Sequence, residues 1–452
     1  MRDEATYCSF GDTVHYLEPP KLFSRCAGSW LYDEEDCPYL DLQMWYSACN
    51  FGYANPRLNQ ALKRQIDTLP QLASQYLHRE KIELAKALAQ NIEQTFGQKG
   101  RVHFNVGGSQ SVEDSLKLVR NASGGKGLMF AFEGGYHGRT LGASAITSSY
   151  RYRRRYGHFG DRAHFIPYPY CFRCPYEKKR DSCDLYCVNQ FARLFDTEYH
   201  GVWDGKAEQA EYAAFYVEAI QGTGGYVIPP AGYFPRLQAI LRERAILLVD
   251  DEIQMGFYRT GTFWAAEQFA LQPDVIVFGK AMTNGMNPLA GLWAKEALIT
   301  PERFPPGSTH STFAANPLGT AVALETVRML QETDYAAQVQ EKGAYLLAGL
   351  RDLQRRFRQV GDVDGLGLAL RMEICGDDGF TPSRELADRL FNEGMKGDLQ
   401  SGGRRYGLVL DIGGYYKNVV TLAPSLEISR EEMDLALQLL EQLLQRVIGS
   451  NG

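Results

Sequence analysis

Lys280 follows the apolar run of residues 274–278 after one glycine, a position from which a lysine can react as an amine. Burial disfavours the charged ammonium form, so it lowers the pKa of a lysine and leaves a nucleophilic amine. A solvent-exposed loop lysine is the ordinary alternative, because most lysines lie at the protein surface. Lys280 is therefore a candidate for covalent catalysis through its amine.

Gly107, Gly108 and Ser109 follow another predicted strand and open a predicted helix. Glycines allow backbone N–H groups to approach an anion, the start of a helix adds positive dipole, and Ser109 adds a hydroxyl donor. These residues predict a cradle for a phosphate group. A plain strand-to-helix turn is the alternative, because glycine and serine are enriched in turns.

Two further groups follow predicted strands. Tyr136 and His137 lie in a glycine-rich segment, where the tyrosine could cover a bound ring and the histidine could act as acid, base or hydrogen-bond donor. A packed tyrosine and a buried histidine are the alternative. Asp250, Asp251 and Glu252 end an apolar run, and buried acids cost free energy unless they meet a cation or a metal ion. Helix or loop capping is the alternative for the acids.

A scaffold must bring these groups together, and the pattern of the chain predicts one. Apolar runs that read as strands alternate with segments of helical spacing from residue 101 to residue 278. That alternation indicates a mainly parallel sheet flanked by helices, an α/β fold. Ligands bind beyond the carboxyl ends of the strands in such sheets, so all four groups are expected at one edge.

The four groups together match the needs of one ligand, a phosphorylated pyridine aldehyde. Its aldehyde requires a lysine for a Schiff base, and its ring nitrogen requires a carboxylate to stay protonated. Its phosphate requires backbone donors, and its ring face requires an aromatic or branched cover.

The chain resembles the class III family of pyridoxal-phosphate-dependent aminotransferases, which have the fold-type-I architecture. The resemblance extends from Gly52 to Pro424. Its most specific motifs, in chain order, are Asp251-Glu252-Ile253-Gln254-Met255-Gly256, Arg259-Thr260-Gly261, Phe278-Gly279-Lys280 and Ser311-Thr312-Phe313-Ala314-Ala315-Asn316-Pro317.

The resemblance implies a role for each residue around the ring of pyridoxal 5′-phosphate. Lys280 is expected to form the Schiff base and to shuttle the proton, and Asp251 to pair with the pyridinium nitrogen. Ile253 and Tyr136 are expected to cover opposite faces of the ring, and Gln254 to bond the ring hydroxyl.

The resemblance also implies how the phosphate is held and how the subunits assemble. Gly108 and Ser109 are expected to bind the phosphate, and Thr312 to reach the phosphate of a neighbouring subunit. Active sites shared in this way imply a homodimer or a dimer of dimers.

The implied activity is the transfer of an amino group from an amino acid, an omega-amino acid or a diamine to a 2-oxo acid. An amino-acid racemase or epimerase on the same fold is the main alternative, with Lys280 returning the proton to the same carbon. A non-catalytic binding or scaffold protein is the remote alternative.

Thr421 departs from the family pattern. Relatives usually carry an arginine here, which grips a substrate carboxylate and pairs with a glutamate at the position of Glu218. A hydroxyl cannot replace the forked guanidinium clamp. We therefore expect a substrate pocket at Glu218 and Thr421 that disfavours dicarboxylic oxo acids and attracts donors with a second ammonium group. The alternative is that Arg139, Arg151 or an arginine of a partner chain replaces the clamp.

Four cysteines, Cys171, Cys174, Cys183 and Cys187, lie close together in an insert of residues 168–190. Four thiolates at such spacing can form a tetrahedral zinc site. A disulfide or simple packing is the alternative.

Composition narrows the function class. The 452 residues include 48 Lys plus Arg and 54 Asp plus Glu, a net charge of −6, which argues against a nucleic-acid binder. The arginines and tyrosines at residues 150–156 are expected to form a solvated or subunit-contact surface. No apolar run reaches the roughly 18 residues of a membrane helix, and residues 1–10 do not resemble a signal peptide. A cytoplasmic enzyme is expected.

The order of the segments predicts two domains. A large cofactor-binding domain is expected at residues 61–325. Residues 1–60 and 326–452 are expected to form a smaller α+β domain from both ends of the chain. A cleft between two such lobes is a favoured place for a ligand.

Overall fold

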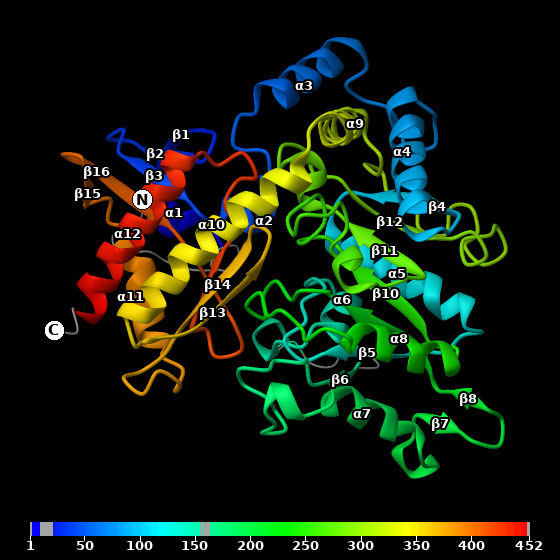
Figure 1. The fold of residues 1–452 in the computed structure, drawn as a ribbon. Helices are drawn as coiled ribbons and strands as arrows, with labels where there is room; N and C mark the ends of the chain where they lie inside the picture. Colours follow the sequence, from blue (N-terminus) through cyan, green and yellow to red (C-terminus); the bar gives the residue numbers. More distant parts are fainter. Residues whose placement is uncertain (1, 10–20, 154–155, 157–162, 450–452) are drawn as a thin grey trace.

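The computed structural model describes residues 2–9, 21–153, 156 and 163–449. The ribbon has a large lobe around one long sheet and a smaller lobe that contains both ends of the described chain (Figure 1). Two short elements, α1 (Arg2–Tyr7) and α2 (Met44–Ser47), precede the large lobe in the chain.

The large lobe confirms the predicted α/β fold. Among the described residues its sheet has seven strands, and all run parallel except β12, which is antiparallel to both of its neighbours. In spatial order the strands are β4 (Gly100–Asn105), β12 (Ala290–Lys295), β11 (Val275–Phe278), β10 (Leu247–Asp251), β9 (Tyr212–Val217), β5 (Leu128–Phe132) and β6 (His164–Ile166).

Helices cover both faces of this sheet. Alternate residues of β5 belong to two apolar clusters: Met129 and Ala131 pack with α5, while Phe130 and Phe132 belong to the cluster that includes α8. Strands buried on both faces explain the almost wholly apolar runs in the sequence. The helices of this lobe are α3 (Pro56–Thr68), α4 (Arg79–Phe96), α5 (Gly108–Ala122), α6 (Leu141–Ile146), α7 (Tyr186–Ala192), α8 (Tyr233–Glu243) and α9 (Pro317–Glu332).

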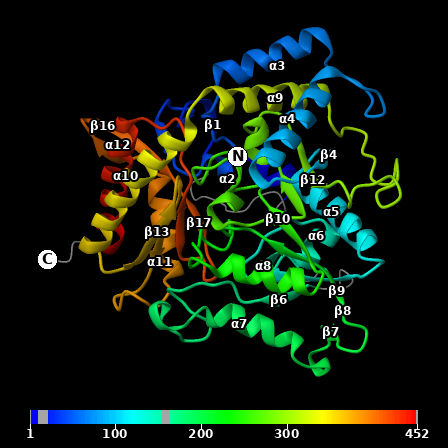
Figure 2. The ribbon, with the colours of Figure 1, turned by 45° about the vertical axis from the view of Figure 1, so that its right-hand side comes forward.

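The ends of these helices follow local sequence rules. Asn55 caps α3 by accepting hydrogen bonds from two backbone N–H groups, and Pro56 occupies the first turn. Pro70 lies in the segment that separates α3 from α4. Figure 2 shows α3 and α9 side by side across the top of the large lobe.

The small lobe joins the two ends of the chain through its sheets. One has the order β1 (Phe23–Ala27), β2 (Trp30–Asp33), β3 (Pro38–Asp41), β16 (Arg404–Val409) and β15 (Leu399–Ser401), with β3 parallel to β16. The other has the order β13 (Val360–Leu366), β14 (Ala369–Ile374), β18 (Val419–Leu422) and β17 (Asp411–Gly413). The pairing of β3 with β16 agrees with a small domain built from both ends, whose boundaries stay a prediction.

Three helices pack in the small lobe: α10 (Tyr335–Arg356), α11 (Arg384–Gly394) and α12 (Arg430–Ile448). A short hairpin of β7 (Trp203–Asp204) and β8 (Gln209–Ala210) projects from the large lobe. None of the helices in the described parts of the chain is both long enough and apolar enough to cross a membrane.

Candidate active site

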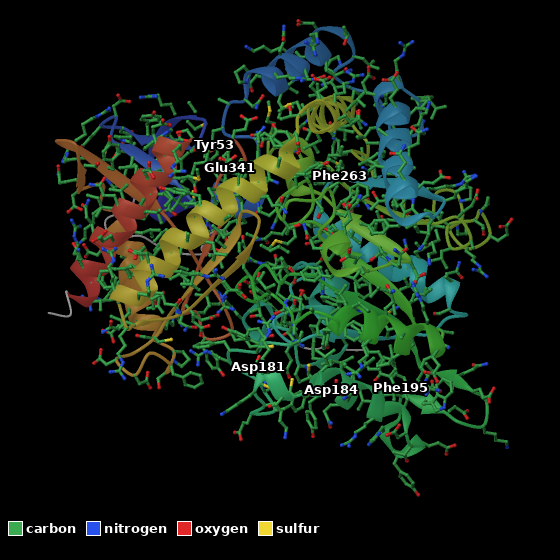
Figure 3. The ribbon with its side chains drawn as sticks, viewed as in Figure 1. Tyr53, Asp181, Asp184, Phe195, Phe263 and Glu341 are labelled. Atoms are coloured by element: carbon green, nitrogen blue, oxygen red, sulfur yellow. The ribbon has the colours of Figure 1, made fainter. Side chains whose placement is uncertain are left out.

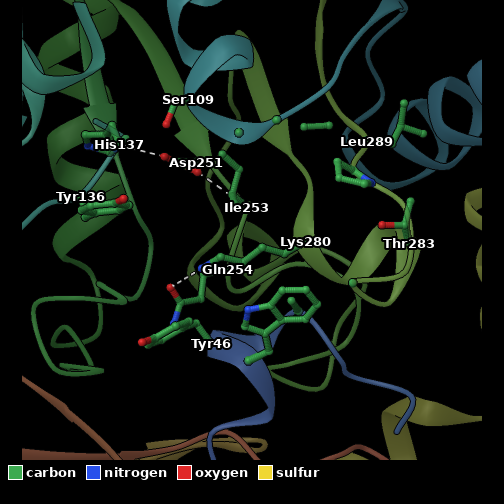
Figure 4. A pocket seen from close by; sticks show the side chains of 18 of the residues that line it. Tyr46, Ser109, Tyr136, His137, Asp251, Ile253, Gln254, Lys280, Thr283 and Leu289 are labelled. Carbon is green, nitrogen blue, oxygen red and sulfur yellow. Dashed lines mark hydrogen bonds and ion pairs between the residues drawn. The ribbon is translucent and has the colours of Figure 1, made fainter. Parts of the chain in front are cut away.

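A cavity of about 350 Å³ lies at the carboxyl ends of the parallel strands (Figure 4). The segments that follow β4, β5, β9, β10 and β11 all contribute to its lining, as expected for one edge of a parallel sheet. The structure thereby brings together eight of the predicted site residues: Gly108, Ser109, Tyr136, Glu218, Asp251, Ile253, Gln254 and Lys280. Thr312, Thr421 and the four insert cysteines do not line this cavity.

Lys280, which follows Gly279 at the end of β11, extends its side chain into the cavity. Its Nζ donates a hydrogen bond to Oε1 of Gln254 at 2.7 Å. Burial lowers the pKa of Lys280 to about 8, against the opposing charges of Glu218, Asp251 and Asp411. A lysine with this pKa is partly neutral near pH 8 and can act as a nucleophile or a base.

Asp251 is held by His137. Oδ2 of Asp251 lies 2.8 Å from Nδ1 of His137, and both side chains are buried. Burial acts to lower the pKa of His137, but the hydrogen bond and charge of Asp251 outweigh it, so the pKa is raised. The other oxygen, Oδ1, accepts the N–H of Ile253 at 3.2 Å. The carboxylate is thus fixed in place at the cavity wall.

The start of α5 is shaped for an anion. No side chain caps its first turn, so the backbone N–H groups there have no intrahelical acceptor. A Cβ added to Gly108 would lie 2.7 Å from Cδ1 of Ile253, and one added to Gly138 would lie 2.3 Å from Oγ of Ser109. The glycines keep this cradle open where a side chain would fill it.

Lys280, Asp251, the α5 cradle and the Tyr136 and Ile253 side chains therefore fit a phosphorylated pyridine aldehyde. Each chemical requirement of that ligand has a residue of the right type in one cavity. Figure 4 shows the Asp251–His137 and Lys280–Gln254 contacts within this arrangement.

Glu218 differs from the free pocket acid that was expected. Its Oε1 accepts the N–H of Tyr136 at 2.8 Å, and its Oε2 accepts the N–H of Gly222 at 2.9 Å. Burial raises its pKa to about 7, although the charge of His137 and these backbone N–H groups act in the opposite direction. Both carboxylate oxygens are thus engaged by the backbone of this lobe.

Thr421 lies buried on β18 and points to a different acid. Its hydroxyl donates a hydrogen bond to Oδ2 of Asp411 at 2.9 Å. Asp411 lines a second cavity of about 200 Å³ that shares Lys280, Tyr46 and Tyr136 with the first. Sequence analysis did not find Asp411, whose one signal was an acid that interrupts the apolar residues 408–412.

The second cavity also contains positive charge. Arg139, Arg151 and Lys417 line it. The guanidinium of Arg139 lies 4.4 Å from the centre of the Tyr152 ring. Arg151, in the basic segment predicted to be a solvated or contact surface, is exposed and lines this cavity, while Arg154 and Arg155 lie outside the described residues.

Thr312 lies in a third, largely apolar cavity of about 750 Å³. Thr312 and its neighbour Phe313 are exposed. Val106 and Pro288 line both this cavity and the first, so the two adjoin. Thr312 is close to the site but outside the pocket formed by its own chain.

The four insert cysteines are free, half-buried thiols. In the ranges that the structure describes, no three His, Cys, Asp or Glu side chains are placed to hold a metal ion, so the zinc interpretation gains no support. A disulfide is not formed either. Figure 3 labels Asp181 and Asp184, two exposed residues of this insert.

The insert instead contacts the small lobe through Arg173. Its guanidinium pairs with the buried carboxylate of Glu373 on β14 and donates a hydrogen bond to the carbonyl oxygen of Phe380. Glu373 also accepts hydrogen bonds from Tyr170 and Arg371. A buried ionic network therefore joins the insert to the other lobe.

Comparisons with known proteins give a consistent result. Residues 14–444 match the family model described as aminotransferase class-III. An ornithine aminotransferase of Bordetella pertussis is 31% identical over 448 residues, which are 97% of this chain and 95% of that protein. An alanine/serine racemase of Pyrococcus horikoshii is 30% identical over 435 residues, which are 94% of this chain and 86% of that protein. The crystal structure of an (S)-enantioselective omega-transaminase from Thermomicrobium roseum has a TM-score of 0.84 at 27% identity and covers 99% of this chain and 97% of that one.

Proposed function

This chain belongs to the class III aminotransferase family, and from that premise we propose which of its residues carry the reaction. It is a pyridoxal-phosphate-dependent enzyme that moves an amino group from an amino donor to a 2-oxo acid. The proposal rests above all on one observation: the amine of Lys280 lies in the same cavity as the Asp251–His137 pair and the start of α5.

Lys280 is the residue that bonds the cofactor and moves the proton. The bound cofactor supplies an electron sink that stabilises negative charge on the donor carbon. The Lys280 amine would accept the proton from that carbon and pass it to the aldehyde-derived carbon of the bound cofactor, and a pKa of about 8 suits a group that must accept and donate a proton near neutral pH. Gln254 holds the Lys280 amine before the cofactor is bonded to it.

Asp251 holds the proton on the pyridine nitrogen, and His137 keeps the carboxylate oriented. Gly108 and Ser109 bind the phosphate through backbone N–H groups and a hydroxyl. Tyr136 and Ile253 cover the two faces of the ring. These assignments are supported by the lining of the cavity and by the hydrogen bonds of Asp251.

Transfer can be tested with purified holoenzyme and a panel of amino donors. The first half-reaction, run with a donor but without an oxo acid, should convert the cofactor to its amine form. The amount converted should equal the amount of enzyme present. A donor that converts the cofactor and a 2-oxo acid that restores it would establish an aminotransferase. Absence of both changes with every donor would contradict the proposal.

Amino-acid racemisation is the second candidate activity, and the similarity to a racemase is the observation that favours it. A racemase returns the proton to the same carbon from the opposite side, so a single-enantiomer amino acid loses its optical activity without net transfer. Chiral chromatography of the donor in the same experiment separates the two activities.

We propose that the preferred donors carry a second ammonium group. The similarity to an ornithine aminotransferase, the replacement of the usual arginine by Thr421 and the acid at Asp411 support this. Arg139 and Arg151 line the same cavity and can take over carboxylate binding, so we expect 2-oxo acids with one or with two carboxylates to be accepted.

A cytoplasmic homodimer is the proposed assembly. The exposed, apolar cavity around Thr312 and Phe313 adjoins the cofactor pocket, and a second copy of the chain can cover it and bring the partner's Thr312 to the phosphate. Free thiols at all nine cysteines suit a reducing compartment. Sedimentation of the holoenzyme would measure the assembly.

A further inference from the structure

We propose that Asp411 selects the amino donor by binding its second ammonium group, with Thr421 as the residue that positions the carboxylate. This inference rests on the proposed aminotransferase function and names the residue that sets its substrate class. It reassigns to Asp411 the attraction for a second amine that sequence analysis placed on Glu218. In a diamino acid this second amine is the α-ammonium group, while the distal amine reacts at Lys280.

Asp411 lies in the small lobe, and side chains of that lobe bind both oxygens of its carboxylate. Asp411 lies on β17 opposite Thr421 of β18 in the antiparallel register. Its Oδ2 accepts the Thr421 hydroxyl at 2.9 Å, and its Oδ1 accepts Nε2 of Gln43 at 3.4 Å. These neutral donors orient the carboxylate without neutralising it.

Asp411 forms no ion pair with a lysine, arginine or histidine among the described residues, although the charge of Lys417 acts on it from the same cavity wall. It is half-buried at the wall of a cavity, where a carboxylate is poorly solvated and gains free energy when a cation enters. Its charge acts to raise the pKa of Lys280, as expected for an acid that faces the reacting amine across a shared space.

Glu218 is less suited to this task, although it also lines the site. Glu218 does not line the second cavity with Arg139 and Arg151, and its side chain is almost fully buried. Its raised pKa of about 7, caused first by burial, also means that it is partly neutral near pH 7. Asp411 is the acid that lies on the wall of the same cavity as the two arginines.

The cavity wall carries both signs of charge. Arg139, Arg151 and Lys417 line it with Asp411, so a carboxylate and an ammonium group on one carbon can be bound together. That pair is the head of an α-amino acid. A diamino acid bound by its head would direct its distal amine to Lys280, which lines the same cavity.

Thr421 explains why the acid is available. An arginine at this position would face Asp411 across the strand pair and neutralise it. The short hydroxyl instead donates one hydrogen bond and leaves the charge for the substrate. Threonine in place of arginine at position 421 thus removes a cation and leaves the charge of Asp411 unpaired by that strand.

The test compares donors that differ only in the second amine. Three matched pairs serve: 2,4-diaminobutyrate with 4-aminobutyrate, ornithine with 5-aminovalerate, and lysine with 6-aminohexanoate. For wild-type holoenzyme and Asp411→Asn, the ratio of kcat/KM between the members of each pair is measured with one oxo acid. We expect the diamino acid of at least one pair to be favoured, and Asp411→Asn to lower that ratio about 10- to 100-fold, as for loss of a charged hydrogen bond.

Asp364→Asn is the matched control. Asp364 lies on β13 of the same sheet and lines neither cavity, and its Oδ1 accepts the backbone N–H of Gly365. Asp364→Asn should therefore leave the ratio of kcat/KM within each pair unchanged. Thr421→Val should lower the ratio in the direction of Asp411→Asn, and Thr421→Ser should retain it, since serine keeps the hydroxyl. A purely structural role for Thr421 would change both members of a pair equally.

A binding measurement keeps the inference separate from turnover. In the Lys280→Ala background, which cannot complete transfer, calorimetry should give tighter binding of the diamino acid than of its partner, and Asp411→Asn should abolish that difference. Equal use and equal binding within every pair, or an equal loss for both members in Asp411→Asn, would overturn the inference while transfer itself persists. Loss of transfer with all six donors in wild type would instead contradict the proposed function.

Discussion

Nδ1 of His137 lies 2.8 Å from Oδ2 of Asp251, and both side chains are almost fully buried. The last residue of β10 and a residue of the segment after β5 are thus fixed to one another at the wall of the cofactor cavity. The hydrogen bond to His137 thus fixes the position of the Asp251 carboxylate.

His137→Phe should destabilise the folded protein in a pH-dependent way. The pKa of His137 is raised above its usual 6.5, because its bond to Asp251 outweighs burial, so folding favours the protonated ring. This stabilisation is fully present below about pH 6.5 and is lost as the pH rises through the raised pKa. Urea unfolding of holoenzyme should show a difference of about 1.5–3 kcal/mol near pH 6 that shrinks toward pH 9. A change at the exposed His200 should show no such trend.

Lys280→Ala should abolish transfer, with a loss of at least about 100-fold, because the residue that moves the proton is gone. Borohydride should no longer fix the cofactor to the chain, which mass spectrometry of the reduced protein detects. Lys295→Ala is the control, since Lys295 pairs with Asp274 and does not line the cavity. Persistent labelling of the Lys280 variant would identify a different lysine.

Capture of the cofactor by the apoenzyme should depend on the pKa of Lys280. Only the neutral amine attacks an aldehyde, and burial lowers the pKa to about 8. The rate of capture, followed by absorbance, should therefore rise with pH and reach half of its maximum near pH 8. A midpoint above pH 10, as for an exposed lysine, would mean that the amine is not desolvated before the cofactor binds.

Thr421→Arg should weaken the preference for diamino donors. In the observed register the new guanidinium meets Asp411, and Glu218 is already engaged by the backbone. Thr421 is buried, so the larger side chain should also cost about 1–3 kcal/mol of stability. Steady-state rates with ornithine and 5-aminovalerate would show the loss. Improved use of 2-oxoglutarate with unchanged donor preference would point to a pair with Glu218 instead.

Arg173→Ala should loosen the contact between the cysteine-bearing insert and the small lobe. The change removes one charged partner of Glu373, while Arg371 remains, so a loss of about 1.5–3 kcal/mol in unfolding free energy is expected. Arg180→Ala, in the exposed part of the same insert, is the control. Equal effects of the two changes would show that the network does not stabilise the fold.

The large lobe could be predicted from sequence because its signals are local. The runs that became β10 and β11 are apolar on both faces, and the segment after each strand carries its chemistry. β12 was missed, although it is almost wholly buried. It lies antiparallel between parallel strands, and its place is set by pairing with β4 and β11 rather than by a pattern of its own.

The substrate side of the site could not be predicted in the same way. Asp411 and Lys417 lie in the small lobe and meet Lys280 only because the two lobes pack together. No spacing along the chain encodes that approach. Glu218 was expected to present a free carboxylate, but the loops at Tyr136 and Gly222 fold back to bind it, which depends on backbone geometry.

The separation of Asp411 from Lys280 has an evolutionary consequence. The acid stands on a strand pair of one lobe, while the lysine and its partners stand on the sheet of the other. Mutations at β17 and β18 can therefore change which amines are accepted while the bonds that orient Asp251 and Lys280 stay in place. Substrate specificity can therefore change through mutations here without loss of the catalytic residues. This is a physical route by which one ancestral scaffold gives rise to enzymes with different amino donors.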